Sequence, residues 1–168
     1  MNTMKHIGSL ILMIALLLCS CNNSTSDLEI ELPINSVFIP ASIAINKADL
    51  DDEQRNEIMN LVNNNHIVND ISELPNDPIG QNEAFHHINF DEYTLLIMYF
   101  FKSYSIDTYS NRFYKNTEEN TFNWVVRIGT FTDSEDYGED VNLTRFAILV
   151  KKLPADADVI TWRSLTTL

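Results

Sequence analysis

The densest group of residues that could do chemistry is an acidic segment around position 136. Its carboxylates could bind Ca²⁺, which takes six to eight oxygen ligands and needs a turn that glycine permits. Against the EF-hand pattern, acids stand at the first and third positions and Gly138 at the sixth, but Tyr137 is fifth and Thr144 twelfth. We therefore interpret residues 133–142 as a solvated acidic loop, with calcium binding as the alternative. The candidate calcium ligands are Asp133, Glu135, Asp136, Glu139 and Asp140.

A second group places His86 and His87 just before Asp91 and Glu92. Zinc needs histidines that share a face, typically at i,i+4 on a helix or i,i+2 on a strand. Adjacent histidines in a strand point to opposite sides. His66 lies too far along the chain to complete a site by its spacing. We therefore predict no zinc site here.

Motifs for nucleophilic catalysis are absent from the sequence. It contains no serine elbow, no Cys/His pair and no Ser-x-x-Lys motif, and carboxylate pairs carry no weight in a chain with 24 acids. We therefore expect that the protein is not an enzyme, with a small hydrolase built from dispersed residues as the alternative. Aromatic residues could instead form a glycan- or peptide-binding face, although aromatics in strands are more often core. These residues are Trp124, Trp162, Tyr99, Tyr104, Tyr109 and Tyr114.

The N-terminus has the pattern of an export signal. A short start with Lys5 precedes about a dozen apolar residues, a length typical of a signal peptide and too short to span a bilayer. The following residues, Leu18-Cys19-Ser20-Cys21, resemble the bacterial lipobox. This resemblance implies a signal peptide over residues 1–20 and lipid attachment at Cys21. Residues 21–27 would then form the lipidated cysteine and a flexible tether, and no cysteine would remain for a disulfide or a metal.

Charge limits the partners that the protein can have. Cleavage before Cys21 removes Lys5, so ten basic residues would face 24 acids, a net charge of −14. This balance argues against nucleic acid and against a domain that lies flat on anionic lipid. Acids at Asp27, Glu29 and Glu31 are similar to the cluster of surface-exported Bacteroidota lipoproteins. We expect an outer-membrane lipoprotein facing the periplasm or the cell surface, with the lipid as its membrane contact.

Residues 28–168 are predicted to form a single α+β domain, an antiparallel β-sheet of about five to six strands with one N-terminal covering helix. Period-2 alternation over residues 28–32 indicates an edge strand, and residues 49–63 have helical spacing with Asp49 or Asp51 as the cap. The continuous apolar run in residues 93–104 predicts a central strand buried on both faces. Further strands are expected at 108–115, 121–131, 143–153 and 159–165. Residues 73–90 contain the longest irregular stretch, which we interpret as a crossover connection.

A strand pattern also suggests a family. Ile88-Asn-Phe-Asp91, the strand from Tyr93, and the segment from Phe146 to Lys152 resemble small Bacteroidota lipoproteins of unknown function. They also resemble the C-terminal domain of PrcB-like accessory proteins of protease complexes. Asn89 replaces an acid of that pattern, and the proline usual near Lys151 is missing. We therefore expect a lipid-anchored, non-enzymatic binding or accessory module with a protein or glycan partner, or an accessory or inhibitory subunit of an envelope protease.

Overall fold

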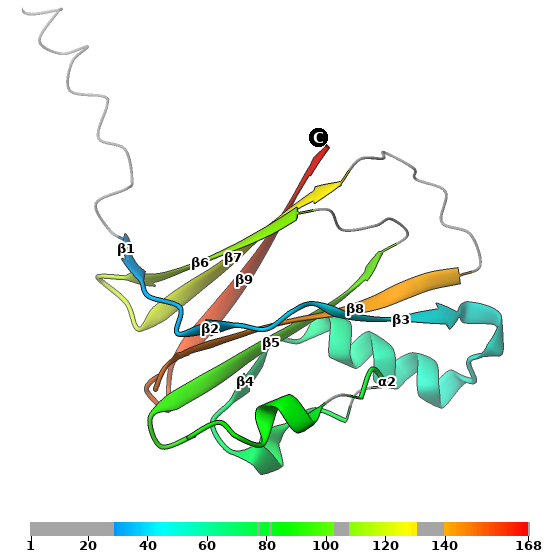
Figure 1. Cartoon of the computed structure of the whole chain (residues 1–168), viewed down its shortest axis with the longest axis horizontal. Helices are drawn as coiled ribbons and strands as arrows, with labels where there is room; N and C mark the ends of the chain where they lie inside the picture. Colours follow the sequence, from blue (N-terminus) through cyan, green and yellow to red (C-terminus); the bar gives the residue numbers. More distant parts are fainter. Residues whose placement is uncertain (1–28, 77, 81, 103–107, 131–139, 168) are drawn as a thin grey trace, which may run out of the picture.

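A computed structural model describes residues 29–76, 78–80, 82–102, 108–130 and 140–167. Within these residues the chain forms nine strands in two sheets, with one α-helix and short 3₁₀ turns. The four-stranded sheet has the order β1-β6-β7-β9, and the five-stranded sheet has the order β2-β8-β5-β4, with β3 also paired to β8 (Figure 1). The predicted α+β class with an antiparallel sheet and one helix is confirmed, although the strands are more numerous than the expected five to six and are divided between two sheets.

The four-stranded sheet combines β1, at the start of the described chain, with three strands from its second half. All its pairs are antiparallel except β7 with β9, which run parallel. Its strands are β1 (Glu29–Leu32), β6 (Thr108–Asn116), β7 (Thr121–Thr130) and β9 (Asp158–Thr167).

The five-stranded sheet is antiparallel throughout. Its central pair, β5 with β8, runs from Tyr93 opposite Lys151 to Lys102 opposite Asn142. Its strands are β2 (Ser36–Val37), β3 (Ala41–Asn46), β4 (His66–Val68), β5 (Tyr93–Lys102) and β8 (Asp140–Lys151).

Strand β5 has two buried faces because it lies between two separate cores. Leu96, Met98 and Phe100 pack with β6, β7 and β9 in the core between the sheets. Leu95, Ile97 and Tyr99 face the second core, which α2 (Asp52–Asn63) and Phe85 cover. Successive residues of a strand point to opposite faces, so an apolar layer on each side accounts for the continuous apolar run.

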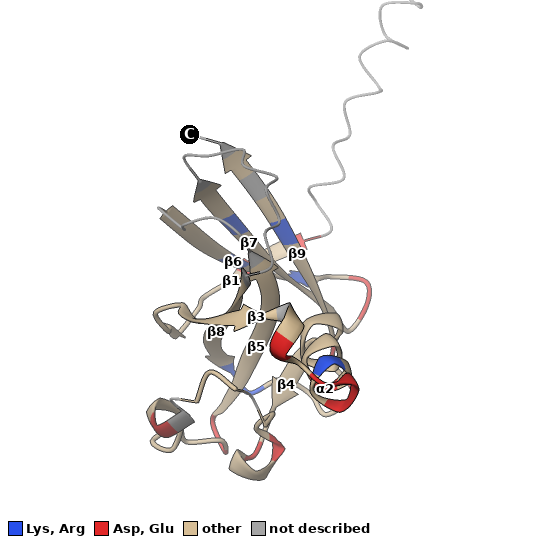
Figure 2. Ribbon diagram, turned by 90° about the vertical axis from the view of Figure 1, so that its right-hand side faces the viewer, with Lys and Arg blue, Asp and Glu red and all other residues tan. Residues whose placement is uncertain are grey.

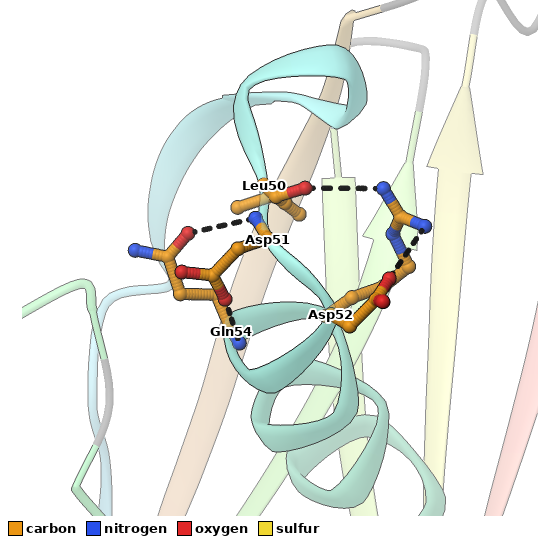
Figure 3. A network of polar contacts seen from close by, with 5 residues as sticks. Leu50, Asp51, Asp52 and Gln54 are labelled. Atoms are coloured by element: carbon orange, nitrogen blue, oxygen red, sulfur yellow. Dashed lines mark hydrogen bonds and ion pairs between the residues drawn. The ribbon is translucent and has the colours of Figure 1, made fainter.

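Helix α2 begins three residues later than predicted, because Asp51 has an extended backbone and caps it. The Asp51 carboxylate accepts from the Gln54 amide at 2.8 Å, and the Gln54 side chain accepts from the Asp51 amide at 3.1 Å (Figure 3). This reciprocal capping box satisfies two amides that the helix leaves without a partner. The preceding residues form a 3₁₀ turn, η3 (Lys47–Asp49). The helix ends at Asn63, as its run of asparagines predicts.

The irregular stretch after β4 contains two 3₁₀ turns, η4 (Ile71–Glu73) and η5 (Asn82–Phe85). Lys152 fastens it to the sheet, since its ammonium donates to the carbonyls of Asn69 and Phe90 at 3.1 and 2.7 Å. Thr94, which is buried, donates to the Asn69 side chain at 2.7 Å and accepts from the Leu153 amide at 3.0 Å. The stretch is thus a connection held against the start of β5 and the end of β8. The prediction of a crossover is wrong, because β4 and β5, which it joins, are adjacent antiparallel strands.

Candidate binding face on the four-stranded sheet

The four-stranded sheet has one face turned toward solvent. On β7, Phe122, Trp124, Val126 and Ile128 are buried between the sheets. The intervening residues Asn123, Val125 and Arg127 therefore point outward. Parallel pairing aligns them with Ile160, Trp162 and Ser164 of β9. We refer to this surface as the outward face.

Trp162 is the most prominent residue of the outward face. Its side chain is 57% exposed, yet its indole N–H donates to Asn123 Oδ1 at 3.1 Å. The amide of Asn123 in turn donates to Glu29 Oε1 on β1 at 2.5 Å. Because the indole can only donate, the oxygen of Asn123 must face Trp162 and its nitrogen must face Glu29. The ring is therefore held in one orientation across the sheet.

A second set of polar contacts on the outward face involves β6. Arg112 is 3.5 Å from the Glu31 carboxylate of β1 and donates to the Tyr114 hydroxyl at 3.1 Å. Arg112 is the register partner of Val125, and Val125 is the partner of Trp162. Two strand spacings, about 10 Å, therefore separate the backbones of Arg112 and Trp162.

The sheet differs in charge from the rest of the molecule. Its four strands carry four basic and three acidic residues, two of the acids on β1, in a chain with 11 basic and 24 acidic residues. Figure 2 shows basic residues on β7 and β9, and acidic residues on α2 and on the loops below the five-stranded sheet. Within the described part of the chain, the side chain of Arg127 is exposed and forms no ion pair or hydrogen bond.

The outward face thus combines an exposed indole with guanidinium and amide donors. Such a surface can stack the C–H face of a sugar or cover an apolar peptide side chain, while the donors select hydroxyl or carboxylate groups. A shifted pKa lies elsewhere, on Asp70. The hydroxyl and amide of Ser72 donate to its carboxylate at 2.6 and 2.9 Å and lower its pKa, with a smaller contribution from Lys152.

The acids predicted as calcium ligands are mostly not placed by the structure. Asp133, Glu135, Asp136 and Glu139 lie outside the described residues. The predicted loop over 133–142 is wrong at its end, because Asp140 begins β8 and pairs with Asn46 of β3. Strand β3 supplies a hydrogen-bonding partner that the local sequence does not reveal, and this extends β8 toward its N-terminus.

The histidines do not gather with the acids. His86 and His87 are exposed after η5, and Glu92 lies 3.8 Å from Lys151. His66 instead bonds to the Leu61 carbonyl at 3.2 Å and packs edge-on against Tyr99. Among the residues that the structure places, no three His, Cys, Asp or Glu side chains form a metal-binding group.

The aromatic candidates divide between core and surface. Trp124 and Tyr99 are buried, and Tyr109 packs edge-on against Phe146. Tyr104 is not among the described residues. Tyr114 and Trp162 belong to the outward face. Asn123 and Arg127 were not identified as site residues from the sequence. The missing information was the pairing of β9 with β7.

Apolar cavities lie elsewhere on the molecule. One of about 290 Å³ beside α2 is lined by Ile45, Leu50, Arg55, Ile58, Met59 and Phe101. Another of about 370 Å³, beside η5, includes Phe38, Phe85 and Arg145 in its lining. Arg145 is buried there, with its guanidinium 2.9 Å from the Gly80 carbonyl and over the Phe85 ring. Neither cavity contains a histidine in its lining.

Comparison of the chain with protein-family models, curated proteins and solved structures found no match. Residues 1–28, which include Cys21 and the predicted signal peptide, lie outside the described residues. Of the helices that the structure describes, none is long and apolar enough to cross a membrane.

Proposed function

We propose that this protein is a lipid-anchored protein of the bacterial outer membrane and acts as a non-enzymatic binding or accessory module. In this proposal Cys21 carries the lipid, and the outward face of the four-stranded sheet binds a protein or glycan partner. The lipobox-like Leu18-Cys19-Ser20-Cys21 supports the anchor. The exposed, hydrogen-bonded indole of Trp162 is the single observation that carries the binding role.

The proposal follows from the cost of exposing a large aromatic ring. A scattered apolar residue on a surface needs no explanation, but Trp162 adjoins Val125 and Ile160 and is held by Asn123. An aromatic ring already fixed in one orientation loses little conformational entropy when a partner covers it. Tryptophan and arginine are also the residues that most often dominate binding energy at interfaces.

The position of the tether is compatible with a partner on this sheet. Eight residues, 21–28, separate the proposed lipid anchor from β1, and they can span at most about 28 Å. Strands β1 and β9 form opposite edges of the sheet, three strand spacings or about 14 Å apart. Trp162 therefore lies on the edge strand farthest from the tether.

A second candidate is an accessory or inhibitory subunit of an envelope protease. The strand pattern from Ile88 to Lys152 favours it through its resemblance to PrcB-like accessory proteins. In this case the partner bound by the outward face would be a protease subunit. A small hydrolase with dispersed residues stays a third hypothesis.

The binding role can be tested with the intact lipoprotein in detergent extracts of envelopes. We expect wild-type protein to retain one reproducible protein or glycan partner, and Trp162→Ala to lose at least nine-tenths of it. Met59→Ala is the matched control, because Met59 is also a large exposed apolar residue, on α2. Equal capture by all three proteins, or no reproducible partner of the wild type, would overturn the proposal.

A further inference from the structure

Strand β9 leaves a long edge open in the four-stranded sheet. It contains ten residues and is paired on one side with β7; no other described strand pairs with it. An edge strand presents unpaired backbone N–H and C=O groups, which form a template for another extended chain. The open groups of β9 can be identified from one contact.

That contact is a hydrogen bond of 3.1 Å from the Asn65 side chain to the Val159 carbonyl. Asn65 lies outside the sheet, so the Val159 carbonyl points away from β7. In a strand the N–H and C=O of one residue point to the same side, and successive residues alternate. Thr161, Arg163 and Leu165 therefore direct their backbone groups to the open edge. Asn65 covers only the beginning of that edge, through Val159 and the Thr161 hydroxyl.

The edges formed by β1, β2, β3 and β4 are short or flanked by residues that hinder pairing. Strand β1 has four residues, two of them glutamates, and Pro33 follows it. Strands β2 and β4 have two and three residues, and β3 has six between Pro40 and Lys47. Proline, lysine and short length are the usual protections of an edge. Strand β9 contains neither proline nor lysine, and its sequence is rich in Val, Ile, Thr and Trp.

The charged residues on and beside β9 indicate what kind of chain can pair with its open edge. After Asp158, β9 contains no acid, and Arg163 contacts the Phe100 ring at 5.7 Å. Among the residues placed by the structure, neither Arg163 nor Arg127 forms an ion pair with an acid. A second copy of β9 would bring a second Arg163 to this edge and no carboxylate after Asp158. An acidic segment would instead oppose the arginines with carboxylates.

We infer that the open edge of β9 binds an extended acidic segment of a partner protein by β-strand addition. This inference rests on the proposed binding function and specifies a protein partner. The segment forms backbone hydrogen bonds with Thr161, Arg163 and Leu165. A carboxylate opposite Arg163 pairs with its guanidinium, while Trp162 covers the neighbouring residue on the outward face.

The test uses the detergent-solubilised full chain and three synthetic ten-residue peptides. In the first, valine and threonine alternate with glutamate; in the second, lysine replaces glutamate; the third is the first with a central proline. We expect the glutamate peptide to slow amide hydrogen exchange at Arg163 and Leu165 at least tenfold, and the other two to leave it unchanged. Arg163→Gln keeps the backbone donor and should weaken glutamate-peptide binding about fivefold.

The outcomes separate the possible occupants. Protection of these amides by the lysine peptide, or by none of the three, would overturn the inference. Concentration-dependent protection without any peptide would show that a second copy binds the edge, which also overturns it. If the edge binds no peptide while Trp162-dependent capture persists, strand addition fails and the proposed function stands. If peptide binding is normal but capture is absent, the proposed function of the outward face fails.

Discussion

The indole N–H of Trp162 donates to the side-chain oxygen of Asn123 on the adjacent strand, at 3.1 Å. This contact orients an aromatic ring whose side chain is largely exposed, and it joins β9 to β7 on the outward face. The second tryptophan, Trp124, makes a similar bond to Asn111 at 3.0 Å but is fully buried. The two tryptophans therefore have opposite roles, one available to a partner and one in the core.

The first prediction compares these tryptophans by their effect on stability. We expect Trp162→Ala to lower the free energy of unfolding by less than about 1 kcal/mol, because little apolar area is lost from the core. Trp124→Ala should cost about 3–5 kcal/mol, since it leaves a cavity between the sheets. Urea denaturation of both variants measures the difference. Equal losses would contradict the assignment of Trp162 to the surface.

The second prediction concerns the buried hydroxyl of Thr94. Thr94→Val conserves shape but leaves the buried Leu153 amide without its acceptor, so we expect a loss of about 1–3 kcal/mol. Thr144→Val is the control, because Thr144 is also buried but its partner Ser42, at 2.9 Å, is exposed and can bond to water. Denaturant midpoints should rank Thr94→Val clearly below Thr144→Val. The reverse order would contradict this prediction.

The third prediction addresses the capping box of α2. Asp51→Ala removes the acceptor for the Gln54 amide and should cost about 1 kcal/mol. Asp52→Ala removes an exposed ion pair to Arg55 at 3.6 Å and should cost no more than about half of that. Thermal unfolding followed by circular dichroism compares the two variants. A larger loss for Asp52→Ala would refute the cap.

The fourth prediction is a pH dependence at Asp70. Hydrogen bonds from Ser72 lower its pKa in the folded protein, so folding favours the ionised carboxylate. Its stabilising contribution is therefore present above the unfolded pKa and is lost as the pH falls through the folded pKa. We expect the stability difference between wild type and Asp70→Asn to shrink between about pH 5 and pH 2. A difference that stays constant over this range would argue against the prediction.

The sequence predicts those elements whose signals lie within the segment itself. The helix follows from its cap and its apolar spacing, and the two buried faces of β5 follow from an uninterrupted apolar run. Trp124, one of the aromatic candidates for a binding face, is buried in the core, as aromatic residues in strands more often are. In β1, however, alternation did not imply burial, since Ile30 is 56% exposed.

The division into two sheets could not be predicted in this way. Alternation shows which residues share a face, but it does not identify the neighbouring strand or its direction. The parallel return of β9 beside β7 is a long-range pairing, and it alone places Trp162 next to Asn123. The extension of β8 to Asp140 could not be predicted for the same reason, because it depends on pairing with β3. The candidate site was therefore recognised only in part, through Trp162 and Tyr114.

The central claim is that the outward face of the four-stranded sheet binds an envelope partner. Site-specific photo-crosslinking in intact cells tests it most directly, with a photoreactive residue in place of Ser164 on this face or of Ser72 on η4. Both serines are exposed. We predict one discrete adduct from position 164 that disappears in the Trp162→Ala background, and none from position 72. Absence of an adduct at 164, or the same adduct from both positions, would contradict the claim.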